Sequence, residues 1–246
     1  MYCRYLYLFL ILICYCSIAS AQQCSPTFQQ VLFIDGESSA NAVIYTPNEE
    51  VVAVGKLAHD AFILKTASTG QVIWGHSLQN ADTSILNTIK FTSDGNYIAL
   101  GTIAHQLWII KIDTSGQPIW TQTIPIASTP IAAKDIIELS TGGFAIIANS
   151  NDSTITSDGI AARLDATGNP LWIKQFDGTG ADGFNYIHEV NGQLLISGYI
   201  TGDLKDAFLM KLNLSDGSPI STTTYTRKPG WDEEGINIST IPGGYT

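Results

Sequence analysis

Residues Leu164–Trp172 have the sequence Leu-Asp-Ala-Thr-Gly-Asn-Pro-Leu-Trp and join two apolar runs through a tight turn. The pattern recurs at Ile112–Trp120 (Ile-Asp-Thr-Ser-Gly-Gln-Pro-Ile-Trp) and at Thr66–Trp74 (Thr-Ala-Ser-Thr-Gly-Gln-Val-Ile-Trp). The turn glycines of these three copies are Gly70, Gly116 and Gly168, and Gly217 comes one residue late in a fourth copy. They are separated by 46, 52 and 49 residues, a period that is typical of stacked or radially arranged structural repeats.

A second series of turns lies about halfway between these glycines. Its members are Asn48-Glu49-Glu50, Asp94-Gly95, Gly142-Gly143, Asn191-Gly192 and Pro242-Gly243-Gly244. Dipeptides such as Asp-Gly and Asn-Gly between apolar runs indicate β-hairpins, because the turns that match strand twist need positive φ. Each repeat therefore contains four short strands with tight connections, which favour antiparallel neighbours. No segment shows a helical period.

Four-stranded meanders repeated at this spacing predict an all-β protein built as a β-propeller. The predicted blades are residues 28–79, 80–125, 126–177 and 178–226, with a partial fifth at 227–246. Because a propeller closes its ring, four blades and part of a fifth predict an incomplete ring and a fragment of a longer protein. The alternative is that the first strand completes the last blade. The small residues Gly55, Gly101, Ala148 and Gly198 are expected to permit close approach between packed layers.

The N-terminus has the features of a secretory signal peptide. Arg4 precedes an apolar run at Leu6–Cys16, and Ala19-Ser20-Ala21 is a small-residue cleavage site. We therefore expect residues 1–21 to be removed, 22–27 to be a lead-in, and the mature chain to carry no membrane span. The predicted location is extracellular or at the cell surface. Only Cys24 would remain in the mature chain, so no internal disulfide is expected.

The charge and the motifs exclude several classes of function. The net charge of −10 argues against nucleic acid or an anionic membrane as a partner. The sequence contains no zinc-protease, esterase-nucleophile, phosphate-loop or dinucleotide motif. Its four histidines, His59, His76, His105 and His188, lack the spacing of a zinc site. Since His188 and Glu189 are adjacent in a predicted strand, they are expected to point to opposite faces.

One loop carries the candidate metal ligands. Asp177 and Asp182 alternate with glycines in Asp177-Gly-Thr-Gly-Ala-Asp182-Gly183, a pattern in which carboxylates and carbonyls can converge on a calcium ion. Turns use the same residue types, so an ordinary loop is the alternative. No cofactor other than calcium is indicated by the residues themselves.

The repeats resemble those of secreted bacterial propeller proteins, which combine an Asp-Gly-Gly-Tyr turn with a later Gly-x-x-x-Trp. Segments Gly180–Thr201, Asp206–Gly217 and Asp232–Thr246 match this pattern in pieces. The Gly-x-x-x-Trp part is similar to the tryptophan-docking motif of pyrroloquinoline-quinone-type propellers. Trp74, Trp120 and Trp172 occupy the Trp position, and Ser221 departs from it. The fixed repeat position of these tryptophans favours packing between blades, and sugar stacking is the alternative.

The resulting functional hypothesis is a secreted, non-catalytic propeller that binds a protein or glycan ligand or acts as a scaffold. One fold hosts many functions, so alternatives stay open. They are a quinone-dependent enzyme, which the resemblance implies, and a glycan-processing enzyme with paired carboxylates brought together from distant segments.

Overall fold

The computed structural model describes residues 37–78, 82–126, 130–150, 158–176, 182–201, 205–225, 240–241 and 244–245. The chain divides into two units, residues 1–30 and 31–246, and all described residues belong to the second. The predicted signal peptide, Asp177 and most of the predicted fifth repeat lie outside the described residues. No helix in the described part of the chain is long and apolar enough to cross a membrane.

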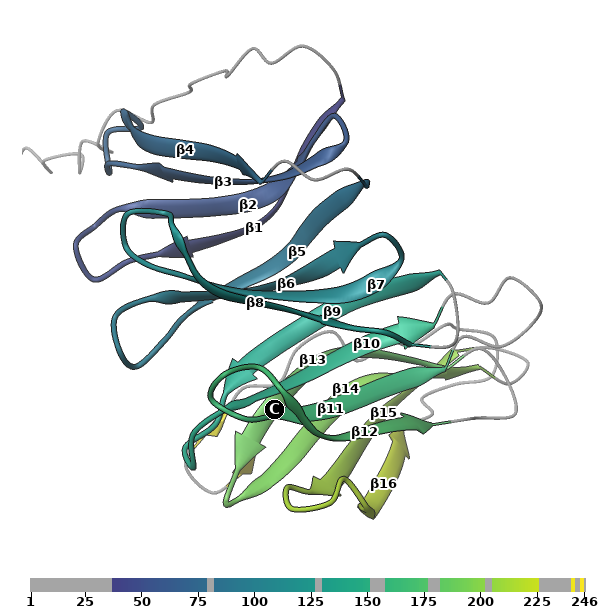
Figure 1. Cartoon of the computed structure of the whole chain (residues 1–246). Helices are drawn as coiled ribbons and strands as arrows, with labels where there is room; N and C mark the ends of the chain where they lie inside the picture. The colour runs from purple at the N-terminus through teal and green to yellow at the C-terminus, as the bar shows by residue number, and fades with distance from the viewer. Residues whose placement is uncertain are drawn as a thin grey trace, which may run out of the picture. The chain divides into compact units, whose positions relative to one another are not determined.

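The described strands form four antiparallel sheets of four strands each (Figure 1). The first sheet contains β1 (Ser38–Tyr45), β2 (Val51–Leu57), β3 (Asp60–Thr66) and β4 (Val72–Leu78). The second contains β5 (Ser84–Phe91), β6 (Tyr97–Ile103), β7 (Gln106–Ile112) and β8 (Pro118–Ile124). The third contains β9 (Ile131–Glu138), β10 (Phe144–Ser150), β11 (Gly159–Leu164) and β12 (Pro170–Phe176). The fourth contains β13 (Gly183–Val190), β14 (Gln193–Thr201), β15 (Lys205–Asn213) and β16 (Pro219–Tyr225).

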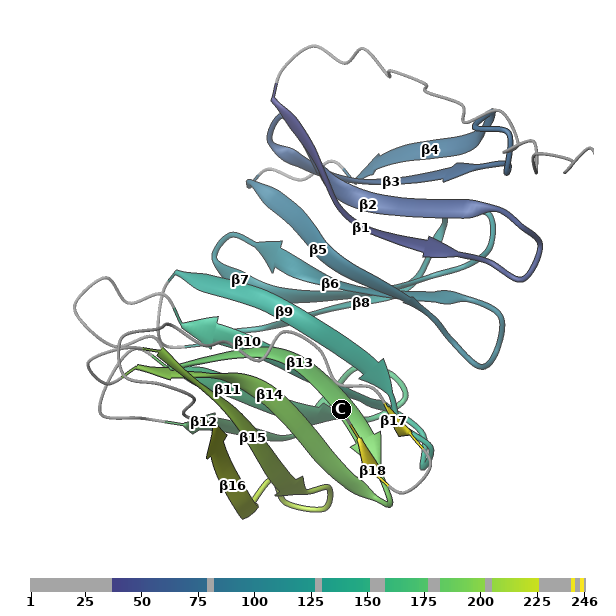
Figure 2. The ribbon, with the colours of Figure 1, turned by 180° about the vertical axis from the view of Figure 1, so that it is seen from behind.

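Within each sheet the strands follow chain order, so every sheet is a meander. This confirms the predicted all-β class and the four-stranded blades. A fifth, two-stranded ladder pairs β17 (Thr240–Ile241) with β18 (Gly244–Tyr245). Among the described strands, the four large sheets do not close into a ring (Figure 2).

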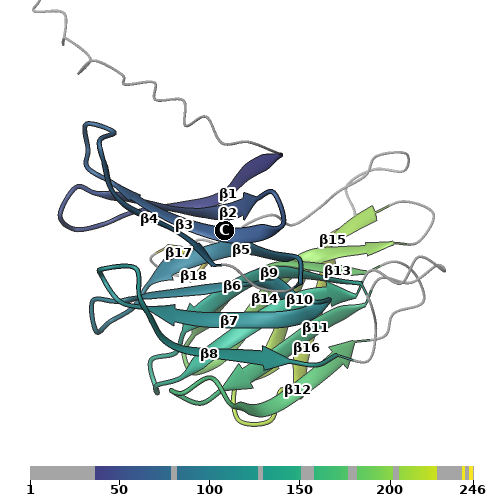
Figure 3. The ribbon, with the colours of Figure 1, turned by 45° about the horizontal axis from the view of Figure 1, so that its top comes forward.

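Neighbouring sheets pack face to face through aliphatic side chains on their second and third strands. Between the second and third sheets, Leu100 and Ile109 meet Ile146 and Ile160 in one buried cluster. Similar clusters lie between the first and second sheets and between the third and fourth. The first strands β5, β9 and β13 also contact one another in turn, so they are the innermost strands (Figure 3). Each middle sheet is therefore buried on both faces, which explains the consecutive apolar residues in its second strand.

The tryptophans join successive sheets, as their repeat position predicted. The indole N–H of Trp74 donates to the carbonyl of Thr114, 3.2 Å away, in the turn of the next sheet. The indole of Trp172 donates in the same way to the carbonyl of Leu214, 3.1 Å away. A Cβ on Gly217 would lie 2.8 Å from the Trp172 ring, and Gly168 has the same relation to Trp120. The turn glycines thus give room for an indole from the preceding sheet.

The small residues after the second turn have a different role from the predicted one. The first strand of each sheet has a bulge, at Asn41, Asn87, Lys134 or Asn185. A Cβ on Gly101 would collide with the carbonyl oxygen of Ile85, next to the bulge in the same sheet. The close approach is therefore between paired strands of one sheet and not between packed layers.

We predict that Gly101→Ala lowers the free energy of unfolding by about 3 kcal/mol, because the added methyl group meets backbone that cannot rotate away. Chemical denaturation measures the change. The control is Gly75→Ala on β4, whose nearest neighbour would be the movable Leu64 side chain at 3.1 Å, and which should change stability by less than about 1 kcal/mol. Equal losses in both variants would contradict the bulge interpretation.

We also predict that Trp172→Ala lowers the free energy of unfolding by about 3–5 kcal/mol, since it removes a large side chain that is packed between two sheets. Ser221→Ala is the matched control, because Ser221 has the same repeat position on β16 and is exposed. The control should stay within about 0.5 kcal/mol of the parent. A small loss for Trp172→Ala would show that the indole does not hold the sheets together.

Candidate functional site

The predicted calcium ligands are only partly described. Asp177 lies outside the described residues. Asp182 immediately precedes β13, and its Oδ1 accepts a hydrogen bond from the backbone N–H of Thr201 at 3.1 Å. Partial burial raises the pKa of Asp182, and the charge of Asp158 adds to the rise. Among the described residues no three His, Cys, Asp or Glu side chains gather as metal ligands. The calcium site therefore stays a prediction.

The histidines are spread over both ends of the strands. His59 and His105 lie in the tight connections β2–β3 and β6–β7, and His105 has a positive φ of 62°. His76 is on β4, where its Nε2 lies 3.3 Å from the carbonyl oxygen of Ser115 in the next sheet. His188 is on the innermost strand β13. The structure gives them no common centre.

Several carboxylates are engaged in shaping the turns that receive the tryptophans. Asp113 accepts hydrogen bonds from the Ser115 hydroxyl and from the backbone N–H groups of Ser115 and Gln117. Asp165 has the same role in the third sheet, where bonds from Asn169 and Thr167 lower its pKa to about 2. These side chains stay ionised and hold the backbone, which makes them poor candidates for general acid catalysis.

The candidate site is a groove that crosses the innermost strands of three successive sheets, with a volume of about 550 Å³. We call it the inner groove. It lies where β5, β9 and β13 run into their hairpin turns. Its lining residues are Lys90, Phe91, Ser93, Ile137, Glu138, Leu139, Ser140, His188 and Glu189. Phe91 is 42% exposed there, which leaves an aromatic surface open to a ligand.

Two glutamates in the inner groove connect neighbouring sheets. Glu138 accepts hydrogen bonds from the backbone N–H of Ser93 (2.6 Å) and from its hydroxyl (2.9 Å). Glu189 accepts the same pair from Ser140, both at 2.7 Å. Each carboxylate keeps lone pairs beyond these two bonds and can accept further hydrogen bonds from a ligand.

An ion pair between a partly exposed lysine and a buried aspartate lies beside the inner groove. Nζ of Lys90 on β5 is 3.0 Å from Oδ1 of Asp135 on β9, and it also lies 5.5 Å from the centre of the Tyr186 ring on β13. The Asp135 side chain is 5% exposed. Its Oδ2 is buried without a well-formed hydrogen bond among the described residues. Three strands are thus joined by one cation.

Burial is the main influence on Asp135 and raises the pKa of its carboxyl group. The charge of Lys90 and the N–H groups of Ile136 and Ile187 oppose this rise without cancelling it. The pair is therefore held at some electrostatic cost, which is common where buried charges serve a specific arrangement.

No sequence motif pointed to this cluster. His188 and Glu189 both line the inner groove, and Glu189 accepts hydrogen bonds from Ser140. Comparison of the repeats could have drawn attention to the site. The strand register places Lys90 of the second sheet and His188 of the fourth at the same repeat position. In the first and third sheets this position is occupied by Ile44 and Ile137. A polar residue at a repeat position that is apolar in other sheets was therefore the signal in the sequence that could have indicated the site.

No protein-family model matches the chain, and no curated protein sequence matches it. Among solved structures, a europium-containing methanol dehydrogenase aligns with a TM-score of 0.46 and 10% sequence identity. The alignment covers 78% of this chain and 42% of the dehydrogenase. A protein described as an exo-β-1,3-galactanase from Bifidobacterium bifidum aligns with a TM-score of 0.44 and 13% identity. The alignment covers 79% of this chain and 69% of the galactanase. BamB from Moraxella catarrhalis has a TM-score of 0.27 at 14% identity, covering 78% and 76%. The chain spans less than half the length of the dehydrogenase.

We predict that Asp135→Asn removes a pH-dependent part of the stability. A carboxyl group whose pKa is raised on folding favours the folded state most below its unfolded value near 4, and loses this contribution as pH rises toward the folded value. The stability of the parent relative to Asp135→Asn should therefore fall as the pH rises above about 4. Urea denaturation at several pH values measures it, and a difference that is constant or grows with pH would contradict the assignment.

Proposed function

We propose that the chain is a non-catalytic binding module whose inner groove takes a basic peptide segment of a partner protein. The observation that carries this proposal is the combination of an exposed Phe91 ring with the carboxylates of Glu138 and Glu189 in one groove. These carboxylates accept hydrogen bonds from Ser93 and Ser140 of the preceding sheets. Their remaining lone pairs suit lysine or arginine donors.

The charge balance supports a cationic partner. Lys90 is neutralised by Asp135, so Glu138 and Glu189 leave the inner groove with excess negative charge. The whole chain also carries a formal net charge of −10, which attracts cationic ligands over long range. Ile137 and Leu139 provide apolar surface for a neighbouring side chain of the peptide. Export from the cell, as proposed from the N-terminal sequence, would place this partner outside the cell.

We predict that a random peptide library selected on the whole chain enriches sequences with lysine or arginine beside an aromatic or aliphatic residue. Phe91→Ala should weaken the best peptide at least tenfold, measured by fluorescence anisotropy. The control is Ile119→Ala, which removes an aliphatic side chain that is 48% exposed on β8, outside the groove lining. Binding should also weaken with salt, because it depends on charge.

Other results would count against the proposal. Enrichment of acidic peptides, equal losses in both variants, or binding of glycans alone would remove the basic-peptide assignment. A thermal shift or spectral change on addition of quinone and calcium would favour the enzyme hypothesis that the Gly-x-x-x-Trp resemblance implied.

A further inference from the structure

Three residues of the inner groove occupy one and the same repeat position. Phe91, Glu138 and Glu189 lie at equivalent places near the ends of β5, β9 and β13, as the strand register shows. The first-sheet residue at this position is Tyr45, at the end of β1. We call these four residues the end row. From the first sheet to the fourth, its members are aromatic, aromatic, acidic and acidic.

The aromatic half of the end row is open to solvent. The Tyr45 side chain is 65% exposed, and that of Phe91 is 42% exposed. Aromatic rings contribute a large apolar area when a ligand covers them. Two exposed rings on neighbouring innermost strands therefore provide a surface for two apolar side chains of one ligand.

The acidic half of the end row is held in a fixed orientation. Both carboxylate oxygens of Glu138 accept hydrogen bonds from Ser93, and both of Glu189 accept them from Ser140. Because the two glutamates use the same pair of bonds, the step from the second sheet to the third resembles the step from the third to the fourth. A carboxylate that is positioned before binding loses little conformational freedom when a basic side chain joins it.

The spacing of the end row matches that of an extended chain. Cα atoms of β1 and β5, of β5 and β9, and of β9 and β13 come within 8 Å of one another. Two residues of an extended chain span about 6.6 Å, whereas three span about 10 Å. Alternate side chains of an extended chain also point to the same side. A segment that crosses the innermost strands can therefore present every second side chain to successive members of the end row.

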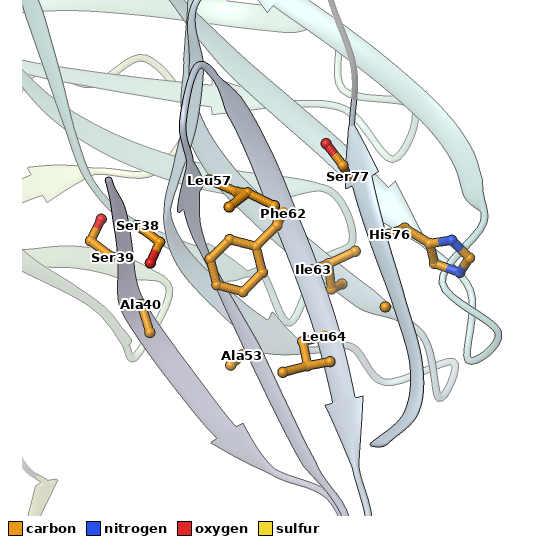
Figure 4. A pocket seen from close by; sticks show the side chains of 11 residues that line it. Ser38, Ser39, Ala40, Ala53, Leu57, Phe62, Ile63, Leu64, His76 and Ser77 are labelled. Atoms are coloured by element: carbon orange, nitrogen blue, oxygen red, sulfur yellow. The ribbon is translucent and has the colours of Figure 1, made fainter. Parts of the chain in front are cut away.

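A groove on the first sheet has no such order. Its volume is about 340 Å³, and it is lined mainly by Ala40, Leu57, Phe62 and Leu64. Figure 4 shows Phe62, Leu57 and Leu64 on β2 and β3 beside the start of β1, while the ring of His76 points away from them. Its described lining residues include no carboxylate. This groove therefore offers no partner for a basic side chain, and Phe62 can serve as an aromatic control outside the end row.

We propose that the end row binds an extended segment of the partner protein in which alternate residues are apolar, apolar, basic and basic. Tyr45 and Phe91 contact the two apolar side chains, and Glu138 and Glu189 accept hydrogen bonds from the two basic ones. The residues between them point away from the end row. This inference rests on the proposed binding of a basic peptide, and it specifies the sequence pattern of that peptide.

Two synthetic peptides of equal composition test the spacing, each offered in both chain directions. One is Leu-Thr-Leu-Thr-Lys-Thr-Lys, and the other is Leu-Leu-Thr-Thr-Thr-Lys-Lys. The alternating peptide should bind the whole chain at least tenfold more tightly, measured by fluorescence anisotropy. Equal affinities would overturn the alternating pattern and leave the basic-peptide function standing. If neither peptide binds in either direction, both the pattern and the proposed function fail.

Paired substitutions in the chain and in the peptide test the order of the acidic members. Glu189→Gln should weaken the alternating peptide at least fivefold, and this loss should vanish once the terminal lysine of the peptide is replaced by glutamine. The loss in Glu138→Gln should depend on the inner lysine instead. Coupling of both glutamates to the same lysine, or no coupling to either, would overturn the proposed order.

The aromatic members have their own test. Tyr45→Ala should weaken the alternating peptide at least threefold, and the loss should vanish when the outer leucine of the peptide is replaced by threonine. Phe62→Ala is the matched control and should leave the affinity unchanged, since Phe62 lies outside the end row. Thermal unfolding of each variant verifies that it is folded at the temperature of measurement. An unchanged affinity in Tyr45→Ala, or an equal loss in Phe62→Ala, would contradict the inference.

Discussion

Burial of one sheet face against the next is the interaction on which the structure depends. A single four-stranded meander has two faces, and in the middle sheets both are apolar, so such a sheet is not stable alone in water. Neighbouring sheets bury these faces by stacking, with aliphatic side chains in the middle of each interface and an indole at its outer edge. The indole of Trp172, for example, packs against Gly217 and donates to Leu214 of the following sheet. Stability is then largely a sum over interfaces, as in other repeat proteins.

This arrangement also explains why so many charged side chains are structural. A tight turn that receives an indole must hold its shape, and Asp113 or Asp165 does so by accepting three or more hydrogen bonds from its own turn. In the first two sheets, the lysine in the second-to-last position of the third strand forms an ion pair with the other turn of the same sheet. Nζ of Lys65 lies 2.6 Å from Oε2 of Glu50, and Nζ of Lys111 lies 2.6 Å from Oδ2 of Asp94. The acidic and basic side chains that recur in the repeats are thus explained by the contacts that they make with the turns.

Much of the fold could be predicted from the sequence because the information is local and repeated. Glycine in a turn marks positive φ, as at Gly116 with 86°, and the apolar runs between turns mark strands. The role of Gly101 could not be predicted, because the carbonyl that it must avoid belongs to Ile85, sixteen residues earlier in the paired strand and near the bulge at Asn87. The inner groove was missed for a related reason. Lys90 and Asp135 are 45 residues apart and meet only because two sheets stack in register.

The places where the repeat is not followed carry the information about function. At one register position the innermost strands have Ile44, Lys90, Ile137 and His188, and two residues earlier they have Ala42, Thr88, Asp135 and Tyr186. Packing alone would be satisfied by aliphatic residues at all eight positions, as the first sheet shows. The polar and aromatic members gather in the second to fourth sheets, where the ion pair of Lys90 with Asp135 costs desolvation that an apolar pair would not. Three sheets share this departure on adjoining strands, and the inner groove, for which we propose a binding role, lies beside it.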